Sequence, residues 1–284
     1  MGMISKRRRQ QISIEMRRNK GILVALSFLV FVALLSIFAF LSPYDPDAID
    51  VLHKMEGPSA AHWCGTDDLG RDYLTRVLFG GRISLVVGLV AMLISTAIGV
   101  TVGTVSGYFG GWVDNILMRI VDILSSIPWL ILVTVISIYF RPGLQTIITV
   151  IGLFTWMGIA RLVRAETLSV KEREYVLYAE AMDQSKLFII VRHVLPSVLP
   201  TIIIAATTGI ANAIMTESAL SFLGFGVQPP MSSWGSMLNR AQVMLGRAPY
   251  MAIIPGVMII LTVYSFNKIG DLIRVIAEPR ATEK

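Results

Sequence analysis

Residues 21–41 read GILVALSFLVFVALLSIFAFL, without one ionisable side chain. The core of a lipid bilayer is about 30 Å thick and offers no partners to open backbone groups, so apolar helices of about 20 residues cross it. At about 1.5 Å per residue, this run reaches about 31 Å. Of all 284 residues, 54% are hydrophobic and 15% are charged, whereas soluble domains carry about 25% charged residues. The sequence therefore predicts an all-α integral membrane protein.

A cleaved signal peptide is the alternative interpretation of this first run. The run is longer than a typical signal-peptide core, and the sequence SPYD at 42–45 lacks a small-residue cleavage site. We therefore expect the run to be a transmembrane helix. Five further apolar runs raise the predicted number of transmembrane helices to six, and the third is expected to be kinked or broken near Pro128. The predicted spans are residues 21–41, 83–108, 120–140, 144–160, 199–223 and 250–266.

The basic residues predict the orientation of these spans, because Lys and Arg are retained on the cytoplasmic side. With the N-terminus inside, 18 of the 25 Lys and Arg residues fall on the inner side and seven on the outer side. We therefore expect both termini to be cytoplasmic. The predicted segments are a basic tail 1–20, a first transmembrane helix 21–41, a structured outer loop 42–82 and a five-helix core 83–284. Within that core lie an inner loop 161–198, an outer segment 224–249 and a cytoplasmic tail 268–284.

Several kinds of chemistry have no sequence support. No Gly-Lys dipeptide occurs, so the chain lacks the P-loop of an ATPase. The three His residues stand far apart without Cys or carboxylates at ligand spacing, so no metal site is expected. No recognition motif accompanies the basic tail, which we interpret as a topology signal and a partner of anionic lipids rather than of nucleic acid. We therefore do not expect an enzyme.

The most informative polar segment is residues 174–196, EYVLYAEAMDQSKLFIIVRHVLP. Its apolar spacing predicts a helix up to Met182, a break at Asp183 and Gln184, and a second short helix 186–193 capped by Ser185. Two short amphipathic helices joined to membrane spans are well suited to dock into a groove on another protein. A helix lying on the lipid surface is the alternative.

This segment resembles the EAA motif, which is the cytoplasmic coupling loop of ABC importer permeases. The pattern in the peptide-importer branch is close to EYVEAARALGAS, followed by RHxLP. Here Tyr178 replaces the first Ala of the pair, and Asp183 replaces a Gly that suits a turn with positive φ. Because Asp enters that conformation at modest cost, we expect the turn to be kept. The matching residues are Glu174, Tyr175, Val176, Ala179, Ala181, Ser185, Arg192, His193, Leu195 and Pro196.

Two further stretches and the C-terminal end agree with this resemblance. The run GTDDLGRD at 65–72 and the run ESALSFLGFGVQPP at 217–230 are similar to signatures of one permease subunit of dipeptide, oligopeptide and nickel importers. The ending with GDL at 270–272 and EPR at 278–280 resembles its G-D-x-L…D-P-R pattern, with Glu for Asp. The chain thus resembles the C-type permease of peptide importers from about residue 20 to 280.

The resemblance implies a type I ABC importer permease fold in a bacterial or archaeal cell membrane. It implies a channel-forming subunit for di- or oligopeptides that pairs with a paralogous second permease. Two ABC ATPase subunits would use ATP and Mg²⁺ below it, and an extracytoplasmic binding protein would deliver the substrate. This chain would itself bind no cofactor or metal. Nickel or another small solute is an alternative cargo, and a stand-alone secondary transporter is the alternative class.

Four sets of residues are the predicted sites. The first set would couple the permease to the ATPases or, alternatively, pack the loop on its own spans; it comprises Tyr178, Ala179, Glu180, Ala181, Asp183 and Leu187. The second set would dock the binding protein, gate the pore or hold the outer loop by ion pairs; it comprises Asp67, Asp68, Arg71, Asp72 and Arg76. The third set, Gly99, Gly103 and Gly107, has the spacing of a helix-packing face. Finally, Asp122 and Glu217 either line the transport path or are satisfied by internal hydrogen bonds.

Overall fold

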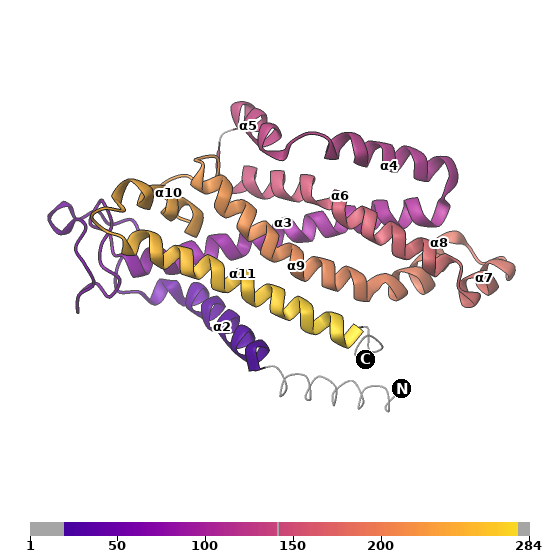
Figure 1. Cartoon of the computed structure of the whole chain (residues 1–284), viewed down its shortest axis with the longest axis horizontal. Helices are drawn as coiled ribbons and strands as arrows, with labels where there is room; N and C mark the ends of the chain where they lie inside the picture. Colours follow the sequence, from indigo (N-terminus) through magenta and orange to yellow (C-terminus); the bar gives the residue numbers. More distant parts are fainter. Residues whose placement is uncertain (1–19, 141, 278–284) are drawn as a thin grey trace.

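The computed structural model describes residues 20–140 and 142–277, and they form a bundle of helices elongated in one direction (Figure 1). A π-helical turn, Ile190–Val194, connects α8 to α9. Short 3₁₀ turns lie at Phe38–Leu41 and Val51–His53. The α-helices are α2 (Lys20–Ile37), α3 (Tyr73–Phe109), α4 (Gly111–Ser125), α5 (Trp129–Tyr139), α6 (Leu144–Lys171), α7 (Glu174–Ala181), α8 (Lys186–Ile189), α9 (Leu195–Phe222), α10 (Trp234–Met244) and α11 (Tyr250–Ala277).

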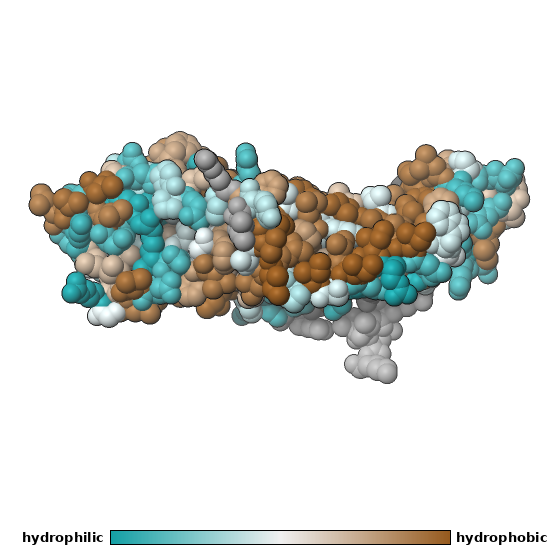
Figure 2. Space-filling view, turned by 90° about the horizontal axis from the view of Figure 1, so that it is seen from above, coloured by the Kyte–Doolittle hydropathy of each residue, from teal (hydrophilic) through white to brown (hydrophobic). Residues whose placement is uncertain are grey.

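The long helices α3, α6, α9 and α11 run side by side along the bundle, and α2 packs against α11 and α3 (Figure 1). The segment 42–72 and α10 lie at one end, and α7 and α8 lie at the other (Figure 1). Along the middle of the face in Figure 2, apolar residues gather, while hydrophilic residues are more frequent at its ends. In the described part of the chain, five helical runs can cross a membrane, and α4 with α5 supplies a sixth if this bent pair is one span.

The break expected near Pro128 is present. The helices α4 and α5 meet at an angle of 79°, and Pro128 stands immediately before α5. Proline disfavours helical conformation in the residue before it and has no N–H for the preceding turn, so the helix stops there. The first half, α4, starts at Gly111 rather than at residue 120, because Gly110 and Gly111 adopt positive φ and turn the chain after α3.

The second span is longer than its charge-free run. Helix α3 starts at Tyr73, within the region expected to be outer loop, because the carboxylate of Asp72 caps it by accepting a 2.8 Å hydrogen bond from the Thr75 N–H. Arg82 lies inside this extension and donates hydrogen bonds to the carbonyls of Ser36 (3.1 Å) and Ile37 (2.9 Å). Its charge therefore ties α3 to the end of α2 instead of ending the helix.

The prediction of a separate short helix at residues 186–193 is wrong. Instead, α8, the π-helical turn and α9 form one continuous run from Lys186 to Phe222. Ser185 caps this run, as expected, by accepting a 3.3 Å hydrogen bond from the Phe188 N–H. Pro196 and Pro200 lack an N–H for the turn before them, and the wider π-helical turn accommodates the resulting irregularity without a break.

A stripe of glycines brings α3 into backbone contact with α6. A Cβ atom on Gly99 would lie 2.8 Å from the carbonyl oxygen of Trp156, and one on Gly103 would lie 2.5 Å from that of Ala160. One on Gly107 would lie 2.8 Å from the carbonyl oxygen of Arg164. No larger residue fits at these positions unless the helices separate. The predicted packing face is therefore occupied by a helix of the same chain.

We expect Gly103→Leu to destabilise the protein, because the side chain would have to separate α3 from α6. Overpacking of this kind costs about 1–3 kcal/mol. The matched control is Gly256→Leu on α11, where nothing lies within 4 Å of an added Cβ atom. Heating each purified variant and following the loss of monodisperse protein would measure the effect. Equal thermal midpoints for the two variants would contradict close packing at Gly103.

Candidate coupling and solute sites

The knuckle, which we define as residues 174–189, projects from one end of the bundle. Val176 and Ala179 of α7 and Ile189 of α8 are buried in a core cluster with Tyr108 and Val163. By contrast, Tyr178 is 68% exposed and Leu187 is 72% exposed. All six predicted coupling residues lie in the described part of the chain, where Ala179 is buried and the remaining five are exposed. The knuckle therefore has one anchored side and one free side.

The turn expected at Asp183 is present. Asp183 has a φ of 54°, its N–H donates to the Glu180 carbonyl (3.0 Å), and the N–H of Gln184 donates to the Ala179 carbonyl (3.2 Å). These two bonds form a Schellman motif, which ends a helix with a residue in the left-handed region. Asp therefore takes the place that Gly usually occupies and ends α7 sharply before α8.

Polar contacts fix the base of the knuckle to the end of α3 and connect that end to α6. The Tyr108 hydroxyl at the end of α3 donates a 3.0 Å hydrogen bond to the carboxylate of Glu180. Lys171 at the end of α6 donates a 2.8 Å hydrogen bond to the Tyr108 carbonyl, and its Nζ atom lies 5.5 Å from the centre of the Tyr108 ring. A displacement of α7 would therefore act directly on the end of α3, and Lys171 connects that end to α6.

At the opposite end of the bundle, the predicted charged cluster is folded inward. Asp67 and Arg71 are 2% and 4% exposed and form an ion pair with a 2.6 Å distance from Arg71 Nη2 to Asp67 Oδ2. Arg76 is also buried and contacts Asp67 at 3.6 Å and Asp47 at 2.9 Å. Asp68 is the more accessible member. This geometry favours the structural interpretation of the cluster, in which ion pairs hold segment 42–72 on α3.

Aromatic residues attach the same segment to α11. The Tyr250 hydroxyl lies 2.7 Å from the carbonyl oxygen of Thr66 and 2.8 Å from that of Glu56.

The fifth member of the charged cluster, Asp72, is buried as the cap of α3 and lies 2.9 Å from the ring nitrogen Nδ1 of His62. Segment 42–72 is thus a packed part of the protein, held by α3 and α11 together.

Glu217 is fully buried and hydrogen-bonded within the chain. Its carboxylate accepts hydrogen bonds from Ser221 on the next turn of α9 (2.7 Å) and from Ser84 of α3 (3.1 Å). The Ser84 hydroxyl oxygen in turn accepts a 3.2 Å hydrogen bond from the backbone N–H of Trp234 at the start of α10. The geometry therefore favours internal satisfaction of Glu217 over a place on the path. The other candidate, Asp122, is exposed and forms a 3.0 Å ion pair with Arg161.

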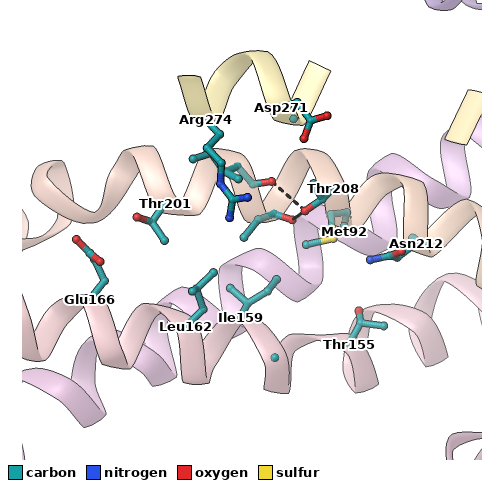
Figure 3. A pocket seen from close by; sticks show the side chains of 16 residues that line it. Met92, Thr155, Ile159, Leu162, Glu166, Thr201, Thr208, Asn212, Asp271 and Arg274 are labelled. Carbon is teal, nitrogen blue, oxygen red and sulfur yellow. Dashed lines mark hydrogen bonds between the residues drawn. The ribbon is translucent and has the colours of Figure 1, made fainter. Parts of the chain in front are cut away.

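A cavity of about 590 Å³, which the sequence did not predict, lies among α3, α6, α9 and α11 (Figure 3). Part of its polar lining comes from Thr201, Thr208 and Asn212, which share one face of α9 at spacings of seven and four residues. This polar stripe in an apolar helix is the signal that could have indicated the site. The other polar lining residues are Thr155 and Glu166 of α6 and Asp271 and Arg274 of α11.

Comparison with known families shows which protein family the chain belongs to. Residues 99–283 match the model of the binding-protein-dependent transport system inner membrane component. The chain belongs to this family. Residues 9–58 match the N-terminal transmembrane domain of oligopeptide transport permease C. It is accordingly a multi-pass inner-membrane subunit of an ABC importer, a class of transporter that also needs an ATPase and a substrate-binding protein.

Curated relatives cover most of this permease. It is 38% identical to the glutathione transport system permease protein GsiD of Pectobacterium atrosepticum, over 93% of this chain and 88% of the relative. It is 39% identical to the dipeptide transport system permease protein DppC of Bacillus subtilis, over 93% of this chain and 83% of the relative. Among solved structures, the inward-facing MetNI methionine ABC transporter matches 72% of this chain and 97% of the other, with a TM-score of 0.61 and 22% identity. This confirms the type I permease fold.

We expect Arg71→Ala to destabilise the permease strongly, because it leaves the buried carboxylate of Asp67 without its closest cation. Breaking one partner of a buried pair costs about 3–5 kcal/mol. The control is Arg240→Ala, since Arg240 is partly exposed and lies 3.8 Å from Asp68. Thermal midpoints of the assembled transporter would measure stability, and titration with the binding protein would measure docking. An unchanged midpoint with weakened docking of Arg71→Ala would instead assign the cluster to partner recognition.

Proposed function

We propose that this chain is one of two non-identical permease subunits of an ABC importer for small peptides. Family membership establishes the import machinery, and the named relatives transport dipeptides and glutathione, a tripeptide. The match of residues 9–58 to an oligopeptide permease domain supports the same cargo class. Nickel or another small solute remains the alternative cargo.

In this proposal, both termini and the knuckle face the cytoplasm, and segment 42–72 and α10 face the binding protein. The excess of Lys and Arg on the predicted inner side supports this orientation. Two partner ATPases bind ATP and Mg²⁺, because the chain itself has no P-loop sequence. The chain therefore contributes the path and the mechanical linkage, and carries no ATPase site of its own.

The observation that supports this linkage most directly is the two-sided knuckle. Tyr178 and Leu187 present apolar surface to the outside, as expected of a helix that docks into a groove. On its inner side, Glu180 holds the knuckle to the end of α3, and α8 continues without interruption into α9. A movement of the ATPases would reach the membrane spans through these two connections and switch the path between its outward and inward openings.

A stand-alone secondary transporter is the competing class, and it predicts uptake without ATP or partners. The direct test is uptake of a radiolabelled dipeptide into vesicles that contain the four-subunit complex. We expect uptake only when ATP and the binding protein are both supplied. Uptake by this chain alone, driven by an ion gradient, would overturn the proposal.

We expect Leu187→Asp to abolish dipeptide uptake and the stimulation of ATP hydrolysis by loaded binding protein. A desolvated carboxylate in the docking groove would cost more than the apolar contact contributes. The change should not affect membrane insertion, because Leu187 is largely exposed. The control is Leu187→Met, which keeps an apolar side chain of similar size at the same exposed position and should retain uptake and stimulation. Normal stimulation of ATP hydrolysis in Leu187→Asp would contradict a coupling role for the knuckle.

A further inference from the structure

The cavity among α3, α6, α9 and α11 has the dimensions of a site for a small peptide. Its volume of about 590 Å³ lies within the range of about 300–1,000 Å³ that is typical of small-molecule sites. Along α9 its lining extends from Thr201 to Asn212, which is about 16 Å at the rise of an α-helix. An extended peptide covers about 3.3–3.6 Å per residue, so two to four residues fit this length.

The cavity holds charged side chains of both signs on facing helices. Glu166 projects from α6, while Arg274 and Asp271 come from α11 (Figure 3). No ion pair joins Glu166 to Arg274, and neither has a hydrogen-bond or ionic partner in the part of the chain that the structure describes. Asp271 forms one long contact, 3.8 Å, with Lys268. Asp271 and Arg274 are exposed and Glu166 is partly buried, so these charges lie near the ends of α6 and α11, where they are accessible to a ligand that enters the cavity.

The remaining lining suits the rest of a peptide. The side chains of Thr201 and Asn212 also lack partners in the described residues, so they are free to bond to peptide N–H and C=O groups. Between these polar groups lie Met92, Ile159 and Leu162, which offer apolar surface to peptide side chains. Such a lining is chemically suited to peptides of varied sequence, because its charges match the two peptide termini and its apolar residues match side chains of many kinds.

We propose that this cavity binds a di- to tetrapeptide in transit, with Arg274 taking the terminal carboxylate and Glu166 taking the terminal ammonium group. The proposal rests on the peptide import proposed above and adds to it a subsite inside this chain. Asn212 and Thr201 then hold the peptide backbone. A neutral solute of the same size would leave both charges unpaired and would bind weakly.

The first test measures occupancy without transport. In the assembled transporter, the single cysteine of this chain is removed by Cys64→Ser, a reporter is introduced by Ala205→Cys at another lining position, and labelling is measured on this chain alone. We expect alanyl-alanine to slow the reaction of this reporter with N-ethylmaleimide several-fold. Its C-terminal amide and its N-acetyl derivative should protect less. A reporter introduced by Ser126→Cys, at an exposed position outside the cavity, should be unaffected.

The second test assigns the two charges. Arg274→Gln should remove the difference in protection between the dipeptide and its amide, and Glu166→Gln should remove the difference between the dipeptide and its N-acetyl form. Each should also lower ATP-driven dipeptide uptake about tenfold, as expected for the loss of a charge-assisted hydrogen bond. Arg274→Lys keeps the positive charge and should retain most of the protection, which separates lost binding from misfolding. Arg119→Gln and Glu172→Gln are matched controls that do not line the cavity.

The outcomes separate the cavity site from the proposed cargo. If the transporter takes up dipeptide but neither protection nor uptake depends on Glu166 and Arg274, the cavity site is wrong and peptide import stands. If the dipeptide protects the reporter in an arginine-dependent way but no peptide is transported, the site stands and the proposed cargo is wrong. Protection that is equal for the dipeptide, the amide and the N-acetyl form would also overturn the charge assignment.

Discussion

The backbone contact between α3 and α6 is the constraint on which the rest of the bundle depends. It exists because Gly99, Gly103 and Gly107 leave no side chain between the two helices. Because lipid tails are as apolar as the side chains, the hydrophobic effect does not drive helices together in a membrane. Close packing of small residues stabilises such helix pairs instead. Helix α3 can then present Tyr108 to the knuckle at one end and Ser84 to Glu217 toward the other.

Two sets of charged residues in this permease differ in their partners. The first group has its partners inside the chain, since Asp67 forms ion pairs with arginines and Glu217 accepts hydrogen bonds from serines. These groups fasten segment 42–72 and α10 to the long helices. The second group, Glu166 and Arg274, faces the cavity without partners in the described residues. The partners of the first group explain its role in folding, whereas the second group is accessible to the peptide proposed above.

Much of the fold could be predicted from the sequence, since long apolar runs, Pro128 and the left-handed turn at Asp183 each have a local physical cause. The start of α3 was missed because Arg82 looks like loop sequence until its carbonyl partners on α2 are known. The joining of α8 to α9 was missed because prolines usually end helices. The cavity was missed because four helices build it together. Glu166 and Arg274 resemble ordinary charges near the ends of spans until those helices are placed face to face.

The continuous run from Lys186 to Phe222 has a mechanical consequence. It is about 56 Å long at the rise of an α-helix, so a tilt of about 10° about its knuckle end would move Phe222 by about 10 Å. The far end carries Glu217 and, through its serines, the start of α10. A small rotation of this run at its knuckle end would therefore become a large displacement at its other end, because the run is continuous over its whole length.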